Sequence, residues 1–168
     1  MADILFIIAE SNFRDEELFD TKEEIEKRGF STEIASKTAG EKTGMLGAKA
    51  KADIALKDVN VNDYKAIVFV GGAGSRQYFS DQEALKIAKD ADSKGKIVAA
   101  ICIAPVILAN AGLLKGKKAT VFSGNEKAIE QKGAVFVSKN IIKDKNIITA
   151  CGPIAAKMFG SEIAKAIK

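Results

Sequence analysis

Short apolar runs alternate with amphipathic stretches along the chain, and this alternation limits the possible folds more than any other feature of the sequence. The runs Ile4–Ala9, Ala66–Val70 and Ile97–Ile101 are apolar at consecutive positions. Such runs are typical of parallel strands that are covered on both faces. The stretch 14–28 has acidic residues in its first turn and is followed by Gly29, which is typical of a helix. Strands that alternate with helices predict a three-layer α/β/α sandwich around a doubly wound, mostly parallel sheet.

The remaining elements follow the same rhythm. Between Thr43 and Leu56, apolar and polar residues alternate with period two, which predicts an antiparallel hairpin. A second hairpin is expected over 141–149, with its turn at Asp144–Asn146. We also expect strands over 31–36 and 119–122, and helices over 81–93, 104–111, 126–132 and 154–167.

Length and composition favour one domain over residues 1–168. The chain is 47% hydrophobic and contains neither a repeat nor a linker. No apolar run approaches the ~18 residues that a membrane span needs. Because no signal peptide is apparent and there are only two cysteines, we expect a cytoplasmic protein with two free thiols, although a disulfide between them stays open. The net charge is +4, and no basic stripe is interleaved with aromatic residues, so neither nucleic acid nor a membrane is an expected partner.

The sequence contains no histidine. This absence excludes an intact Ser-His-Asp or Cys-His pair within the chain, an HExxH zinc site and a Cys2His2 finger. Any chemistry must therefore use cysteine, carboxylates, lysine, arginine or hydroxyl groups. We expect no cofactor and no metal ion.

Because ligands of doubly wound sheets bind beyond the carboxyl ends of the strands, the residues after each strand are the candidates for a site. Cys102 lies between the strand 97–101 and a helix with Pro105 in its first turn. This order predicts a nucleophile elbow, a tight turn that exposes the thiol at the sheet edge. The helix N-terminus is then expected to lower the thiol pKa from about 8.5 toward roughly 3.5–7.5. The alternative is a small buried cysteine with no role.

Two further strand ends contribute candidates. The small residues 71–75 (GGAGS) allow backbone N–H groups to face an oxyanion near the thiol, although a plain flexible turn has the same composition. A phosphate loop is a poor match, because the Lys-Ser/Thr pair is missing. Four carboxylates follow the first strand, and the functional interpretation is that one of them faces the thiol as a coupled pair that shares a proton. The ordinary preference of acids for a helix N-terminus explains the same residues without a site; they are Glu10, Asp15, Glu16 and Glu17.

Taken together, these features resemble the ThiJ/PfpI superfamily, which contains a Parkinsonism-associated deglycase and an archaeal intracellular cysteine peptidase. The resemblance covers nearly the whole chain; its motifs are 13–18 (FRDEEL), 70–72 (VGG), 99–105 (AAICIAP) and 113–118 (LLKGKK). It implies a flavodoxin-like sheet of the class I glutamine-amidotransferase type. It further implies that Cys102 is the nucleophile, that Glu17 hydrogen-bonds it, and that the N–H groups of Gly72 and Ile103 form an oxyanion pocket.

The sequence also departs from the family pattern. Peptidase-type members carry histidine directly after the cysteine, where this chain has Ile103. Deglycase-like members usually carry histidine near Phe122, and it is missing too. The Arg or His that often precedes the late Gly-Pro turn is Cys151 here. Gly71, Phe122 and Cys151 are therefore candidates for the surroundings of the site, and Cys151 is equally well explained as a small residue at a strand end.

Three functions remain open at this point. The first is a glyoxalase- or deglycase-like enzyme that acts on small reactive carbonyls through Cys102 and Glu17 without histidine. The second is a redox-sensing stress protein in which a peroxide oxidises Cys102 and protonated Glu17 stabilises the sulfinate. The third is an intracellular cysteine peptidase with a non-standard acid and base. The expected partner is a small carbonyl compound or a peroxide, and the resemblance implies a homo-oligomer based on dimers.

Overall fold

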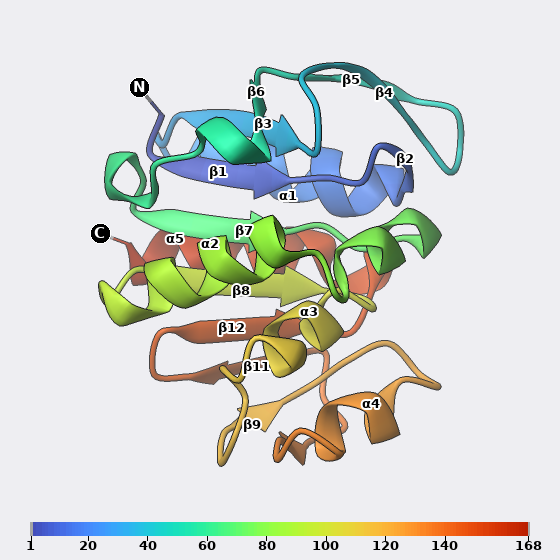
Figure 1. Cartoon of the computed structure of the whole chain (residues 1–168), viewed down its shortest axis with the longest axis vertical. Helices are drawn as coiled ribbons and strands as arrows, with labels where there is room; N and C mark the ends of the chain where they lie inside the picture. The colour runs from blue at the N-terminus through green and yellow to red at the C-terminus, as the bar shows by residue number, and fades with distance from the viewer. Residues whose placement is uncertain (1, 168) are drawn as a thin grey trace.

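The computed structural model describes residues 2–167. Its centre is a seven-stranded sheet in the order β11-β12-β8-β7-β1-β3-β6. All neighbouring strands are parallel except β11, which runs antiparallel to β12. The predicted fold class is confirmed: the sheet is mostly parallel, with helices on both faces (Figure 1). The strands are β1 (Ile4–Ile7), β3 (Thr32–Ser36), β6 (Ile54–Ala55), β7 (Ala66–Phe69), β8 (Ile97–Ile101), β11 (Ile141–Asp144) and β12 (Ile147–Ala150).

Each face of the sheet is covered by two main helices. On one face, α1 (Asp15–Lys27) and α5 (Ala156–Ala166) pack against each other and against the side chains of Ile4 and Phe6. On the other face, α2 (Gln82–Ser93) and α3 (Pro105–Asn110) cover Leu5 and Ile7. Successive residues of a strand point to opposite faces, so a strand between two helical layers must be apolar at every position. This requirement explains the consecutive apolar residues in the sequence.

The predicted hairpin after the second strand exists, but its boundaries differ. Its strands are β4 (Gly40–Gly44) and β5 (Lys49–Ala52), and β2 (Ser11–Phe13), which we did not predict, joins them in a three-stranded sheet. Residues 54–55 do not continue the hairpin, although their alternation suggested it. They join the main sheet as β6, because the Asp53 N–H donates to the Ile34 carbonyl at 2.7 Å and brings the chain back to β3.

The strand predicted over 119–122 is wrong in extent and place. Only β9 (Lys118–Ala119) is a strand, and it pairs with β10 (Val135–Phe136) in a separate two-stranded sheet. The next residues turn toward the main sheet: the Thr120 N–H donates to Thr149 Oγ1 at 3.0 Å, and the Phe122 N–H donates to the Cys102 carbonyl at 2.8 Å. These bonds place Phe122 beside the end of β8.

The remaining helical segments are short. They are α4 (Glu126–Glu130) and the 3-10 turns η1 (Leu56–Asp58), η2 (Val61–Asp63), η3 (Ala73–Tyr78) and η4 (Pro153–Ala155). The predicted helix over 154–167 begins as η4 and becomes α-helical at Ala156. In the part of the chain that the structure describes, no helix is both long and apolar enough to cross a membrane.

Candidate active site

Cys102 lies immediately after β8 in a strained backbone conformation. Its φ is +67°, in the left-handed region that non-glycine residues rarely adopt. Two backbone bonds hold this conformation: the Cys102 N–H donates to the Ala150 carbonyl at 2.9 Å, and its own carbonyl accepts from Phe122. The α3 helix begins three residues later at Pro105. The tight strand-to-helix turn that the sequence predicts is therefore present, and it directs the largely buried thiol toward a cavity.

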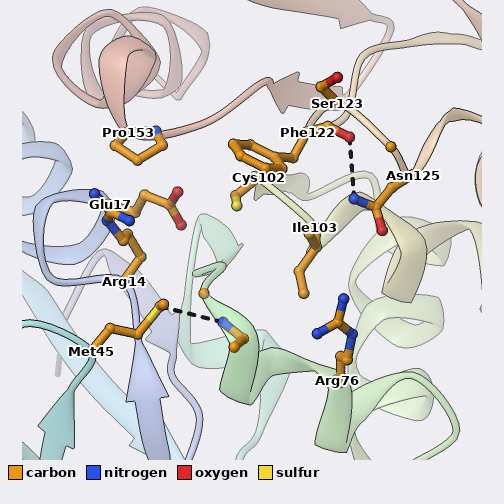
Figure 2. Close-up of a pocket in the computed structure, with 13 residues that line it drawn as sticks. Arg14, Glu17, Met45, Arg76, Cys102, Ile103, Phe122, Ser123, Asn125 and Pro153 are labelled. Atoms are coloured by element: carbon orange, nitrogen blue, oxygen red, sulfur yellow. Dashed lines mark hydrogen bonds between the residues drawn. The ribbon is translucent and has the colours of Figure 1, made fainter.

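Glu17 is fully buried in the first turn of α1. Neither carboxyl oxygen has a hydrogen-bond partner of good geometry within residues 2–167. The carboxyl and the thiol meet across Gly71, at the end of β7. A Cβ atom on Gly71 would lie 2.5 Å from Glu17 Oε1 and 2.5 Å from Cys102 Cβ. Only glycine therefore fits between the two groups. Figure 2 shows the Glu17 carboxyl beside Cys102.

Burial raises the pKa of both members of this pair. It raises the pKa of Glu17 to about 8, although the Cys102 thiol and the Gly71 N–H favour the ionised form. Burial, together with the negative charge of Glu17, raises the pKa of Cys102 to about 12. The N–H groups of Gly72 and Ile103 favour the charged sulfur and oppose this shift. Our expectation of a lowered thiol pKa is therefore wrong, because the cost of a buried charge beside a carboxylate exceeds what two backbone donors provide.

The other three acids of the first loop and helical turn face different partners. Glu10 accepts from Thr38 Oγ1 at 2.7 Å and pairs with Lys42 at 2.8 Å. Burial alone would raise the Glu10 pKa, but Lys42, Thr38 and Ser36 lower it to about 2. Asp15 accepts from the N–H groups of Leu46 and Ala48, both at 2.9 Å, and fixes the tip of the β4–β5 hairpin.

Glu16 forms a two-pronged ion pair with Arg14, with N–O distances of 2.9 and 3.0 Å. Of the four acids that the sequence offers, only Glu17 faces the thiol.

The glycines after β7 have steric reasons for being there. Gly72 has φ +101°, and a Cβ on it would lie 2.4 Å from the backbone nitrogen of Arg14. A Cβ on Gly74 would lie 1.8 Å from the Ser11 carbonyl oxygen. The loop thus packs directly on the backbone around β2, and this close packing brings the Gly72 N–H to the sulfur of Cys102. A flexible turn does not describe this segment.

A cavity of about 390 Å³ opens in front of the thiol. Phe122, a candidate from the sequence, lines it and is 43% exposed. The sequence interpretation missed several other lining residues, which come from five separate segments between the main strands and helices: Arg14, Met45, Arg76, Asn125 and Pro153. Figure 2 places Cys102 between Arg14 on one side and Arg76 on the other. Arg14 was visible within the 13–18 motif, whereas Met45 and Arg76 gave no signal of a role.

Cys151 does not line this cavity. It borders a neighbouring one of about 220 Å³, and its thiol donates to Asn140 Oδ1 at 3.4 Å. Burial raises the pKa of Cys151 as well. Both cysteines are free, so the prediction of two thiols is confirmed and the disulfide alternative is wrong. Within residues 2–167, no three His, Cys, Asp or Glu side chains gather in a way that would hold a metal ion.

Comparison with known proteins places this geometry in a family. The model of the DJ-1/PfpI family matches residues 2–166. The chain belongs to the DJ-1/PfpI family. An uncharacterized protein of Methanocaldococcus jannaschii is 44% identical over 99% of this chain and 83% of that protein. The protein named deglycase PfpI of Pyrococcus furiosus is 31% identical, over 98% of this chain and 99% of that protein.

Solved structures agree with this DJ-1/PfpI assignment. A ThiJ/PfpI domain protein from Brachyspira murdochii superposes with a TM-score of 0.95 at 33% identity, over 97% of this chain and 94% of that one. DJ-1beta of Drosophila melanogaster superposes with a TM-score of 0.89 at 23% identity, over 99% and 91% of the two chains, which shows a shared fold. The resemblance inferred from the sequence motifs is therefore confirmed at the level of the family.

Proposed function

We propose that this DJ-1/PfpI family member is a cysteine-dependent enzyme acting on small reactive carbonyl compounds, with Cys102 as nucleophile and Glu17 as proton donor and acceptor. The observation that carries the proposal is the pairing of a buried, otherwise unpartnered carboxyl with a buried thiol across Gly71. The relatives of two Pyrococcus species that are named deglycases support the class of substrate.

In the first step, the sulfur adds to an aldehyde. At neutral pH the pair holds two protons, and it loses the first near pH 8. The proton lost is that of Glu17. Its carboxylate then takes the thiol proton as the sulfur forms a bond to the aldehyde carbon and the carbonyl π electrons move onto oxygen. The N–H groups of Gly72 and Ile103 stabilise the developing oxyanion. Glu17 then donates its proton to that oxygen, which leaves a neutral hemithioacetal and a Glu17 carboxylate.

In the second step, the Glu17 carboxylate moves a proton between adjacent carbons. For a 2-oxoaldehyde it removes the C1 proton, and the C–H electrons form the C1–C2 double bond of an enediolate as the C2 carbonyl π electrons move onto oxygen. Glu17 returns this proton to C2, and the C1 hydroxyl proton passes to the C2 oxygen, which gives a thioester and a new hydroxyl group. Water hydrolyses the thioester, releases a 2-hydroxy acid and restores the Cys102–Glu17 pair. The net reaction is the addition of one water molecule, so neither an oxidant nor a reductant is consumed.

Peptide hydrolysis is less compatible with this site. The acylation step of peptide cleavage requires a donor that protonates the amine leaving group as the C–N bond breaks, and imidazole normally provides that proton. The chain has no histidine, and Ile103 occupies the position after the cysteine. An aldehyde has no leaving group, and a single carboxyl is sufficient for its chemistry.

The experiment that tests this proposal is the consumption of methylglyoxal, followed together with the formation of lactate. We expect the wild-type protein to turn methylglyoxal over and Cys102→Ser to lose this activity. Cys151→Ser is the matched control, because it removes the other thiol, which lies outside the cavity. Wild-type protein without Cys102-dependent turnover would sink the proposal. Degradation of casein that requires Cys102 would instead favour a peptidase.

Oxidation of Cys102 is a second candidate, favoured by the raised pKa of Glu17. A protonated carboxyl is a hydrogen-bond donor for an oxidised sulfur. Two peroxide molecules would convert the thiol to a sulfinic acid and release two molecules of water. Intact-protein mass after mild peroxide treatment should then show two added oxygen atoms on Cys102. No oxidation, or equal oxidation of Cys151, would argue against this role.

A further inference from the structure

Arg76 places an unpaired positive charge on the wall of the Cys102 cavity. It lies in η3, its side chain is exposed, and it lines the cavity together with Cys102 and Ile103. Within the described residues its guanidinium has neither an ion pair nor a hydrogen bond. In Figure 2, Arg76 lies on the side of Ile103 away from Glu17, so a ligand attached to the sulfur would lie between the carboxyl and the guanidinium.

The charges that line the cavity do not cancel. Its charged side chains are Arg14, Arg76 and Glu17. Arg14 is neutralised by its two-pronged pair with Glu16. Burial raises the pKa of Glu17 to about 8, so its carboxyl is mostly uncharged at neutral pH. The charge of Arg76 is therefore left without a counterion in a concave site, where the surrounding protein strengthens its field.

One neutral donor on the same wall, the Ala73 N–H, also lacks a good acceptor. The Ala73 N–H donates only to the thioether of Met45, at 3.5 Å, and sulfur of this kind is a weak acceptor. Residues three apart eclipse each other on a 3-10 helix, so Ala73 and Arg76 share one face of η3. Both residues line the cavity. An anionic oxygen is a better partner than the sulfur for these donors.

We propose that the cavity selects carbonyl compounds that carry a carboxylate or phosphate group, and that Arg76 is the residue that binds this group. The inference rests on the proposed function for its reaction, since the aldehyde end of the same molecule is the part that Cys102 attacks. Arg76 is a specificity-determining residue in this account and takes no part in bond making. A guanidinium binds either anion through two parallel hydrogen bonds.

The first test uses two alkylating reagents that differ in charge, and it requires no turnover. Iodoacetate is an anion, and iodoacetamide is its neutral counterpart. Their rates at Cys102, read by peptide mass, give a ratio from which the intrinsic reactivity of the thiol cancels. We expect Arg76→Gln to lower the iodoacetate-to-iodoacetamide ratio roughly three- to tenfold at low ionic strength. Added salt should shrink the difference between the two proteins.

Lys89→Gln is the matched control, because it removes the same charge from an exposed position on α2 outside the cavity. It should leave the ratio near that of the wild type. An unchanged ratio in Arg76→Gln would overturn the inference. An equal fall in Lys89→Gln would also overturn it, because the effect would then come from net charge alone.

The second test compares turnover of methylglyoxal, 4,5-dioxopentanoate and hydroxypyruvaldehyde phosphate, which are a neutral, a carboxylate and a phosphate 2-oxoaldehyde. We expect kcat/KM of the wild type to be higher for at least one anionic substrate, and Arg76→Gln to lower that advantage. The anionic substrate whose kcat/KM falls more in Arg76→Gln shows whether Arg76 binds a carboxylate or a phosphate group. Equal kcat/KM for all three substrates overturns the inference and leaves the proposed function standing. Loss of all turnover contradicts the proposed function, and the alkylation ratio still decides the role of Arg76.

Discussion

At the scale of single residues, Glu17 illustrates what a sequence pattern contains and what it omits. Four acids follow the first strand, and composition alone gives no reason to choose among them. Helical spacing narrows the choice only in part, because Asp15 and Glu17 are both buried on α1 with Leu18 and Ile25, whereas Glu16 is not. That spacing places Glu17 inside the protein. That it meets a thiol from β8 depends on the packing of the whole sheet.

The buried carboxyl predicts a specific dependence of stability on pH. The pKa of Glu17 is about 8 in the folded protein, against 4.5 for an ordinary glutamate. The folded state therefore holds an extra proton between these values. Its stabilising contribution is complete below about pH 4.5 and is lost as the pH rises through 8, with a slope of up to about 1.4 kcal/mol per pH unit.

Glu17→Gln removes this titration. We expect the unfolding free energy of the wild type, relative to Glu17→Gln, to fall by several kcal/mol between pH 5 and pH 8. Urea denaturation of both proteins at several pH values measures this difference, and contributions from all other groups cancel. If the unfolding free energy changes with pH in the same way in both proteins, Glu17 is ionised in the folded state.

Gly71 predicts a steric effect at the same place. Its backbone φ is not in the left-handed region, so Gly71→Ala introduces a methyl group without backbone strain. That methyl group collides with both Glu17 and Cys102, and we expect the collision to lower the unfolding free energy by at least about 1–3 kcal/mol. Gly47→Ala is the comparison, because Gly47 has φ +93° and an added Cβ would meet no atom within 4 Å. We expect Gly47→Ala to lower the unfolding free energy by about 1 kcal/mol through backbone strain alone. Equal unfolding free energies and equal Cys102 alkylation rates in the two variants would contradict the close approach.

At the scale of elements, the strands of the main sheet could be predicted because burial on both faces requires apolar residues at every position. The region 118–140 could not be predicted in the same way. Its two-residue strands have no periodicity to detect, and its course is set by bonds to distant groups such as Thr149 Oγ1 and the Cys102 carbonyl. The turn η3 was missed for a similar reason, since its small residues resemble an ordinary loop.

The β4–β5 hairpin depends on one side chain of α1. Asp15 is buried and accepts the N–H groups of Leu46 and Ala48. Asp15→Asn replaces one acceptor oxygen with a donor, and we expect it to lower the unfolding free energy by about 1–3 kcal/mol. It should also speed tryptic cleavage after Lys42, Lys49 or Lys51. Asp20→Asn, on the same helix without such bonds, is the control. Equal cleavage rates in the two variants would show that Asp15 does not hold the hairpin.

At the scale of the whole molecule, the sheet brings together residues that are far apart in the sequence. The carboxyl ends of β1, β7 and β8 lie at one edge, so Glu17, Gly71 and Cys102 meet there (Figure 1). This convergence follows from the doubly wound fold and could be predicted from it. The residues that complete the cavity could not, because Met45, Arg76 and Asn125 come from loops whose positions no local pattern determines.

Several large apolar side chains remain exposed on the single chain, and they bear on the expected homo-oligomer. Ile154 is 84% exposed and Leu46 is 65% exposed. We expect sedimentation velocity to show a dimer or larger assembly, and Ile154→Asp to shift it toward smaller species. Val135→Asp, at an exposed residue of β10, is the comparison. A monomer at all concentrations would contradict this prediction.

The central claim is that Cys102 and Glu17 act as one catalytic unit, and a double-mutant cycle tests it most directly. The measurement is kcat/KM for methylglyoxal in the wild type, Cys102→Ala, Glu17→Gln and the double variant. We expect Cys102→Ala to abolish turnover, Glu17→Gln to lower it by about 10²–10⁴, and the double variant to be no worse than Cys102→Ala. Turnover that survives Cys102→Ala, or that is unaffected by Glu17→Gln, would contradict the account.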